Sequence, residues 1–168
     1  APENTLAAYR VALSQGAVAA ETDVHLTQDG QVVVLHDRTL KRTTNGQGLV
    51  RRRTLADVQA LDAGAWFSPA FVGEAVPTLA ELLALVRDKA VLCVEIKAAP
   101  QDGGEVIAPK IAALLDESGG RDQAIIFSFH PQQVMAAKAA MPEVPALFLV
   151  QPLDGPVPYT TGLLTMAR

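Results

Sequence analysis

The sequence predicts an α/β protein built around a parallel β-sheet. Hydrophobic residues make up 49% of the 168 residues and aromatic residues only 5%, a balance that favours helix and sheet layers over a β-sandwich. In the second half of the chain, short apolar segments alternate with amphipathic ones, which is typical of consecutive βαβ units. The length suits one hydrophobic core, so we expect a single domain over residues 1–168.

The first elements are a helix and a hairpin. Asn4 or Thr5 can cap a helix that Gly16 would end. A strand is expected over residues 17–26 and a second one over 32–35. The Gln-Asp-Gly sequence between them is a turn signal, so the two strands are predicted to form a hairpin.

The chain is then less regular until it reaches the alternating part. Residues 38–76 hold a short predicted helix around 54–61 and a loop rich in glycine and aromatic residues. Thr78 begins another helix, with Glu81 at the spacing of a capping box. The remaining elements are strands over 90–96, 123–128 and 146–150, and helices over 105–117 and 131–141.

Composition excludes several classes of partner. A net charge of −4 argues against non-specific binding to nucleic acid or to an anionic membrane. Cys93 is the single cysteine, so an internal disulfide is excluded. No apolar run is long enough for a membrane span, and no signal peptide is visible. We therefore expect a cytoplasmic protein without stable membrane insertion, with the periplasm as the alternative; the oligomeric state is not predicted.

Three carboxylates are candidate metal ligands. Glu21 and Asp23 lie two residues apart on a predicted strand, so both point to the same face. Glu95 lies within the apolar strand 90–96. Carboxylates from two parallel strands form an oxygen-rich site suited to Mg²⁺ or Ca²⁺. The alternative is that each acid pairs with a Lys or Arg at a strand end.

His36 and Lys97 are the other candidate functional side chains. His36 ends the second predicted strand, next to Asp37, and a histidine there can act as a general acid or base. The alternative is an exposed loop histidine. Lys97 can neutralise Glu95 or bind a phosphate oxygen, and the sequence leaves both roles open.

Several segments together resemble the bacterial glycerophosphodiester phosphodiesterases, which belong to the superfamily of phospholipase C-like phosphodiesterases. The matching segments occur in the family's order between residues 2 and 97. They are Pro2-Glu3-Asn4-Thr5, Glu21-Thr22-Asp23-Val24-His25-Leu26-Thr27-Gln28-Asp29-Gly30, Val34-Leu35-His36-Asp37, Arg42-Thr43-Thr44, Leu61-Asp62-Ala63-Gly64, Pro77-Thr78-Leu79 and Glu95-Ile96-Lys97.

The resemblance implies a TIM (β/α)8 barrel with a small insertion at about residues 38–76. It also implies a cation held by Glu21, Asp23 and Glu95, and a catalytic role for His36. A second family histidine lies in a His-Arg-Gly motif upstream of the matching segments, and this sequence starts after it. Because the family's last strands are also missing, we expect a barrel that is incomplete at both ends.

The activity implied is metal-dependent hydrolysis of glycerophosphodiesters to sn-glycerol 3-phosphate and an alcohol, as part of lipid and glycerol metabolism. Candidate substrate contacts are Glu3, Lys97, Trp66 and Phe67; Trp66 and Phe67 can equally be packing residues of the insertion. His25 shares a face with Asp23 and is a weaker candidate. Two alternatives are a lysophospholipase D-like enzyme and a catalytically inactive relative that keeps the cation site.

Overall fold

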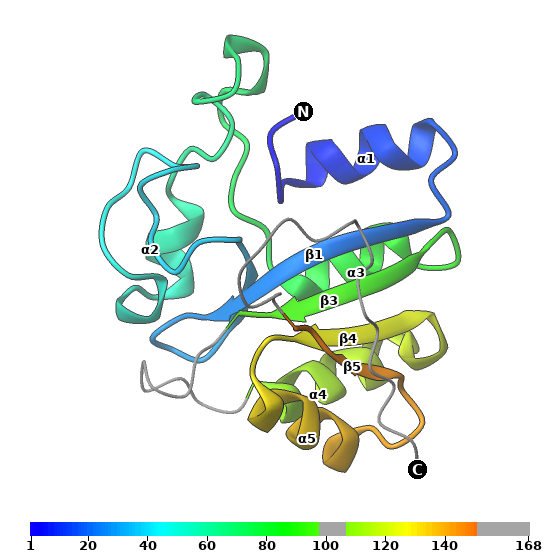
Figure 1. Cartoon of the computed structure of the whole chain (residues 1–168). Helices are drawn as coiled ribbons and strands as arrows, with labels where there is room; N and C mark the ends of the chain where they lie inside the picture. Colours follow the sequence, from blue (N-terminus) through cyan, green and yellow to red (C-terminus); the bar gives the residue numbers. More distant parts are fainter. Residues whose placement is uncertain (98–106, 151–168) are drawn as a thin grey trace, which may run out of the picture.

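A five-stranded sheet organises the protein. The computed structural model describes residues 1–97 and 107–150. The strand order is β2-β1-β3-β4-β5, and neighbours from β1 to β5 are parallel, whereas β2 is antiparallel to β1. The strands are β1 (Ala19–Leu26), β2 (Val32–Val34), β3 (Val91–Ile96), β4 (Ala124–Ser128) and β5 (Ala146–Phe148). The predicted hairpin and the parallel sheet are confirmed (Figure 1).

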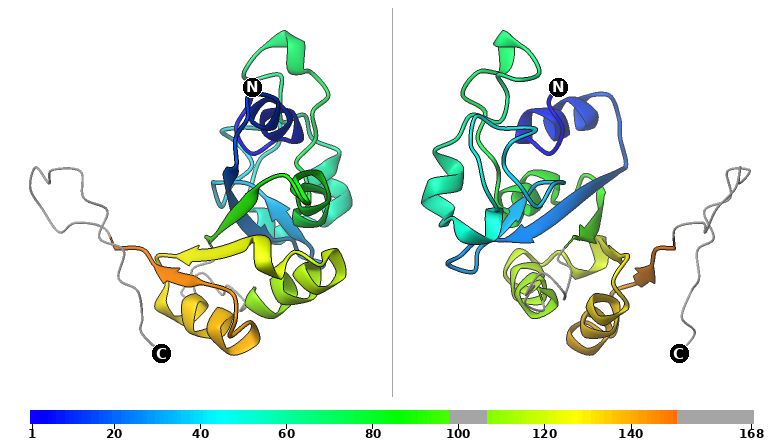
Figure 2. Two further views of the ribbon diagram at one scale, coloured as in Figure 1. Left: turned by 90° about the vertical axis from the view of Figure 1, so that its right-hand side faces the viewer. Right: turned by 60° about the vertical axis from the view of Figure 1, so that its left-hand side comes forward.

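Helices cover one face of this curved sheet, as the two views of Figure 2 show for α3, α4 and α5. The α-helices are α1 (Leu6–Ser14), α2 (Leu55–Gln59), α3 (Leu79–Val86), α4 (Ala108–Ser118) and α5 (Pro131–Ala140), and the 3-10 turns are η1 (Val50–Arg52), η2 (Pro69–Phe71) and η4 (Arg121–Gln123). None of the described helices is both long and apolar enough to cross a membrane.

Side-chain alternation along β3 divides the sheet into an apolar and a functional face. Leu92, Val94 and Ile96 are buried in the main core, which α3 and α4 also line. Their neighbours Cys93 and Glu95 point to the opposite face. The helices therefore bury one side of the sheet, and the other side is left for polar side chains.

A second, smaller core lies under residues 38–76. Its members are buried hydrophobic residues from β2 and the loops that follow: Val33, Leu35, Leu40, Val50, Val58, Ala63 and Val76. Gly64 is required there, because a Cβ at this position would lie 1.8 Å from the Phe71 carbonyl oxygen. This segment has its own packing, and the residue that follows it, Pro77, accepts a hydrogen bond from Val34 N of β2 (2.8 Å).

Most predicted boundaries agree with the structure to within a few residues. The exact cap of α1 is Thr5, whose hydroxyl accepts a hydrogen bond from Ala8 N. Asn4 is not the cap; its φ of 55° places it in the left-handed region, which asparagine tolerates better than most residues. The capping boxes at Thr54 and Thr78 are both formed. The first two residues of the predicted helix 105–117 lie outside the described residues.

Candidate metal centre and acid–base histidine

The three predicted carboxylates converge on the face of the sheet opposite the helices. Asp23 of β1 is the direct register partner of Glu95 of β3, and Glu21 is the partner of Cys93. One carboxylate oxygen from each of Glu21, Asp23 and Glu95 lies within 4.8 Å of the other two. Two adjacent parallel strands thus bring together ligands that are more than seventy residues apart in the sequence.

The cluster carries more negative charge than its protein partners balance. Lys97 Nζ lies 3.0 Å from Asp23 Oδ1 and 2.8 Å from Glu95 Oε1. The pairing of acids with a lysine, considered from the sequence, is therefore present for Asp23 and Glu95. One ammonium group cannot neutralise three carboxylates, and burial together with the charges of Asp23 and Glu95 raises the pKa of Glu21 to about 7.

The donor set fits a hard divalent cation. Glu95 is only 9% exposed, and its Oε1 has the Lys97 ammonium 2.8 Å away, the same ammonium that lies 3.0 Å from Asp23 Oδ1. Three clustered carboxylates that share one ammonium group are costly unless a further cation compensates their charge. Oxygen ligands of this kind suit Mg²⁺ or Ca²⁺.

Asp23 is fixed from its other side by Asn4. Asn4 Nδ2 donates to Asp23 Oδ2 over 2.9 Å. The hydroxyl of Tyr9, a buried residue of α1, lies 2.9 Å from Asn4 Oδ1 and 3.2 Å from the carbonyl oxygen of Glu21, so its hydrogen is available to either acceptor. The sequence predicts Asn4 only as a helix cap, and its place between Glu3 and Thr5 in the matching segment is the one signal for this support.

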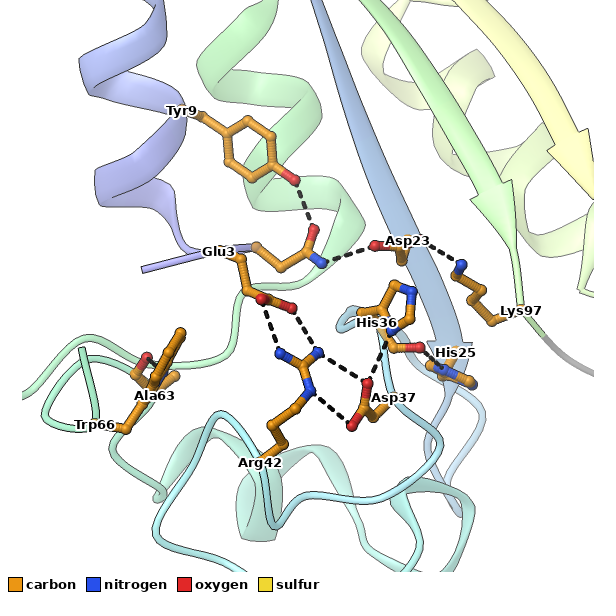
Figure 3. Close-up of polar contacts among 11 residues, drawn as sticks. Glu3, Tyr9, Asp23, His25, His36, Asp37, Arg42, Ala63, Trp66 and Lys97 are labelled. Carbon is orange, nitrogen blue, oxygen red and sulfur yellow. Dashed lines mark hydrogen bonds and ion pairs between the residues drawn. The ribbon is translucent and has the colours of Figure 1, made fainter. Parts of the chain in front are cut away.

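His36 lies at the end of a chain of ionic hydrogen bonds (Figure 3). Its Nδ1 is 2.8 Å from Asp37 Oδ1. Arg42 donates to both oxygens of Asp37, from Nε over 2.9 Å and from Nη2 over 2.8 Å. The same guanidinium donates to both oxygens of Glu3, over 2.9 and 2.7 Å. These contacts with Arg42 hold the pKa of Asp37 down to about 2.

His25 is a buried histidine that contacts the backbone of His36. It is 8% exposed, and its Nε2 lies 3.1 Å from the carbonyl oxygen of His36. Burial lowers its pKa, and the neutral ring donates from Nε2 because a carbonyl oxygen can only accept. His25 thus contacts the backbone of His36, and its alternation with Asp23 along β1 was the sequence signal.

The aromatic candidates lie apart from the carboxylates. Trp66, Phe67 and Phe71 form an edge-on series with ring centroids 5.7 Å apart. The indole Nε1 of Trp66 donates to Ala63 O over 2.9 Å, and Figure 3 shows Trp66 on the other side of Arg42 from Asp23. Packing within the insertion, one of the two predicted roles, therefore accounts for the contacts that these rings make.

Glu3 and Cys93 also border the cluster. Both carboxylate oxygens of Glu3 accept hydrogen bonds from Arg42. Glu3 also lines a cavity of about 340 Å³ between α1 and β1, which Glu21 and Asp23 line too. Cys93 is half-buried, and burial beside Glu21 raises the pKa of its thiol.

The sheet and its carboxylate cluster define an α/β protein with a candidate cation site and an adjacent histidine–carboxylate pair. The chain belongs to the glycerophosphoryl diester phosphodiesterase family, whose sequence profile matches residues 1–157. Its fold is the TIM barrel of that family, present here as part of the barrel.

Individual relatives agree with this assignment. The chain is 40% identical over 155 residues to a glycerophosphodiester phosphodiesterase of Caldanaerobacter subterraneus subsp. tengcongensis, covering 89% of this chain and 62% of the relative. A solved glycerophosphodiester phosphodiesterase from Agrobacterium tumefaciens superposes with a TM-score of 0.79 at 38% identity, covering 87% of this chain and 60% of that one.

A phosphodiesterase from Oleispira antarctica, solved in complex with the product sn-glycerol-3-phosphate, superposes with a TM-score of 0.75 at 33% identity, over 87% of this chain and 60% of that one. The chain thus spans less than two thirds of the length of these relatives.

Proposed function

We propose that the full-length protein hydrolyses glycerophosphodiesters to sn-glycerol 3-phosphate and an alcohol, with one divalent cation, Mg²⁺ or Ca²⁺, as cofactor. The observation that carries this proposal is the convergence of Glu21, Asp23 and Glu95 within 4.8 Å, with His36 in the loop that follows β2. Family membership supports the substrate class, and the relative that holds sn-glycerol-3-phosphate supports the product.

The three carboxylates would hold the cation. When bound, it supplies positive charge to the non-bridging oxygens of the phosphodiester and makes phosphorus more electrophilic. Lys97 adds a second positive charge at the same place, because its ammonium lies within 3.0 Å of both Asp23 and Glu95. Its two predicted roles are compatible: it neutralises the acids in the free protein and contacts a phosphate oxygen in the complex.

His36 exchanges a proton with an ester or hydroxyl oxygen of the substrate. Its side chain is 51% exposed, so the ring is accessible to a ligand on the face that Asp37 does not occupy. We assign His36 one of the two acid–base roles of the reaction. The family resemblance implies a second histidine for the other role.

The remaining assignments follow from position. Glu3, Trp66 and Phe67 are proposed to border the substrate, Glu3 through Arg42 and the cavity it lines, and the two aromatic rings through their exposed faces. Residues 1–168 are proposed to be one domain with an insertion at about 38–76, acting on a small molecule in cytoplasmic lipid and glycerol metabolism.

Metal removal tests the cofactor. Full-length protein dialysed against a chelator should lose the release of glycerol 3-phosphate from glycerophosphocholine and regain it with Mg²⁺ or Ca²⁺. Asp23→Asn should stay inactive after metal is restored, because a neutral amide is a poorer ligand of nearly the same shape. Asp122→Asn, an exposed site on η4, is the matched control and should behave as the parent. Undiminished activity without divalent cations would refute the metal assignment.

A second comparison tests His36 and the substrate class. His36→Ala should lower kcat by about 10²–10⁴-fold and change KM little. A p-nitrophenyl phosphodiester, whose leaving group needs no proton, should restore much of the rate if His36 is the acid. A strong preference for a long-chain lysolipid would instead identify a lysophospholipase D-like enzyme. Cation binding without turnover of any diester would identify an inactive relative.

A further inference from the structure

The position of one hydrogen on His36 follows from its partner. A half-exposed imidazole in water carries its proton on either ring nitrogen. Asp37 Oδ1 lies 2.8 Å from Nδ1 of His36, and an ionised carboxylate can only accept a hydrogen bond. Nδ1 must therefore be the donor, which leaves Nε2 without a proton in the neutral ring.

Asp37 is itself held by Arg42 rather than by the histidine. The guanidinium binds both oxygens of Asp37 from Nε and Nη2, and it binds both oxygens of Glu3 from Nη1 and Nη2. Such a planar fork fixes the plane of each carboxylate, which a lysine ammonium cannot do. Arg42 also keeps Asp37 ionised by lowering its pKa to about 2. At neutral pH Asp37 is therefore an ionised hydrogen-bond acceptor with a fixed orientation.

The net charge of the four hydrogen-bonded residues Glu3, Arg42, Asp37 and His36 stays small whether or not His36 is protonated. Glu3, Asp37 and Arg42 together carry one net negative charge, so the four-residue chain is at −1 with neutral His36 and at zero with protonated His36. Figure 3 shows the ring between Asp37 and the side on which Asp23 and Lys97 lie.

We propose that Asp37 is a positioning residue that fixes the tautomer of His36, with the proton on Nδ1 and Nε2 facing the substrate, and that Arg42 and Glu3 hold Asp37 in place. The inference rests on the proposed acid–base role of His36. One proton is exchanged at Nε2 with a substrate oxygen: the N–H bond forms as the O–H bond breaks, or the reverse. The proton on Nδ1 stays on the histidine, and Asp37 stays ionised throughout.

The tautomer is directly measurable by NMR of protein labelled with ¹⁵N-histidine. The chain has three histidines, and the spectrum of His36→Ala assigns the His36 signals by their loss. At a pH where the ring is neutral, the parent should show a protonated Nδ1 and an unprotonated Nε2. This experiment is made on the parent protein without substrate, and the variant serves only to assign the signals. It therefore tests the tautomer even if the proposed activity fails.

Kinetics of matched variants test the consequence. Asp37→Asn should move the His36 population toward the form protonated on Nε2 and lower kcat by about 10- to 100-fold, less than the loss of the whole histidine, with KM little changed. Arg42→Lys keeps the positive charge but loses the planar guanidinium. It should change both the His36 tautomer population and kcat, each by less than Asp37→Asn does. Asp122→Asn should change neither.

Two results would overturn the proposal: a parent protein in which His36 carries its proton on Nε2, or an Asp37→Asn variant with the parent tautomer and the parent kcat. A parent without phosphodiesterase activity but with the expected tautomer would refute the proposed function and leave the positioning role standing.

Discussion

Replacing Asn4 tests whether the loop before α1 supports the candidate metal centre. Its side chain donates to Asp23 Oδ2 over 2.9 Å and lies 2.9 Å from the Tyr9 hydroxyl, while its backbone has a φ of 55°. Substitution therefore removes two different contributions, a hydrogen bond to a buried carboxylate and a tolerance of left-handed backbone. Glycine removes the first only, whereas alanine removes both.

The two contributions have different magnitudes. A hydrogen bond to a charged group contributes about 1.5–3 kcal/mol to stability. The left-handed conformation costs a residue with a Cβ about 1–2 kcal/mol. Asn4→Gly should thus destabilise the cation-free protein by about 2 kcal/mol, and Asn4→Ala by about 1 kcal/mol more.

Asp88 provides the matched control, because its φ is 58° and its exposed side chain makes no hydrogen bond within the described residues. Chemical denaturation of the four variants Asn4→Gly, Asn4→Ala, Asp88→Gly and Asp88→Ala separates the terms. The difference between alanine and glycine should be alike at both positions. Asn4→Gly should be the more destabilising of the two glycine variants. Equal stability of Asn4→Gly and Asp88→Gly would refute the support of Asp23 by Asn4.

The two Asn4 variants should also bind the cation more weakly, whereas the two Asp88 variants should bind it as the parent does. Asp23 without its hydrogen bond from Asn4 is less well oriented, and loss of such a supporting contact typically lowers metal affinity by about 10–100-fold. Calorimetric titration with Mg²⁺ and Ca²⁺ measures this change without any substrate. Unchanged affinity in Asn4→Gly would show that Asp23 is oriented by the strand alone.

Three further outcomes are expected. Glu95→Gln should remove most of the increase in Tm that Mg²⁺ or Ca²⁺ produces in the parent, measured by thermal denaturation with and without cation. Since the pKa of Glu21 is raised from 4.5 to about 7, folding favours its protonated form, so the unfolding free energy of the cation-free protein should fall as pH rises through this range; Glu21→Gln should flatten this part of the profile in urea titrations. Gly64→Ala should destabilise far more than Gly73→Ala: a Cβ at Gly64 meets the Phe71 carbonyl oxygen at 1.8 Å, whereas at Gly73 nothing lies within 4 Å and only the left-handed φ of 89° costs about 1–2 kcal/mol; equal unfolding midpoints would contradict the packing of the insertion.

Local patterns predicted the carboxylate cluster well. The two-residue spacing of Glu21 and Asp23 fixes their common face once a strand is assumed. The position of Glu95 within an apolar strand predicted that it belongs to the same sheet. The register that makes Asp23 and Glu95 direct neighbours depends on how two strands dock, and no local pattern encodes that.

The supporting contacts were harder to predict. Glu3 and Arg42 are 39 residues apart, and both occur in segments with no regular periodicity. Asn4 was assigned as a possible cap because asparagine favours both caps and left-handed backbone, and the sequence does not separate these. The contacts of His36 with Asp37 follow from adjacency, but the orientation that brings Nδ1 onto the carboxylate is set by Arg42.

The placement of Lys97 between Asp23 and Glu95 makes the binding of two ligands interdependent. In the free protein the ammonium group of Lys97 forms ion pairs with both carboxylates. A cation bound to the same oxygens would weaken the ion pairs of Lys97 with Asp23 and Glu95. The ammonium group would then interact more strongly with a phosphate oxygen. Thermodynamic linkage requires the effect to be reciprocal: an anionic ligand that attracts Lys97 raises cation affinity by the same factor by which the cation raises that of the anion. If the proposed function holds, the site binds a metal ion together with a phosphodiester more tightly than the separate affinities of the two ligands would give.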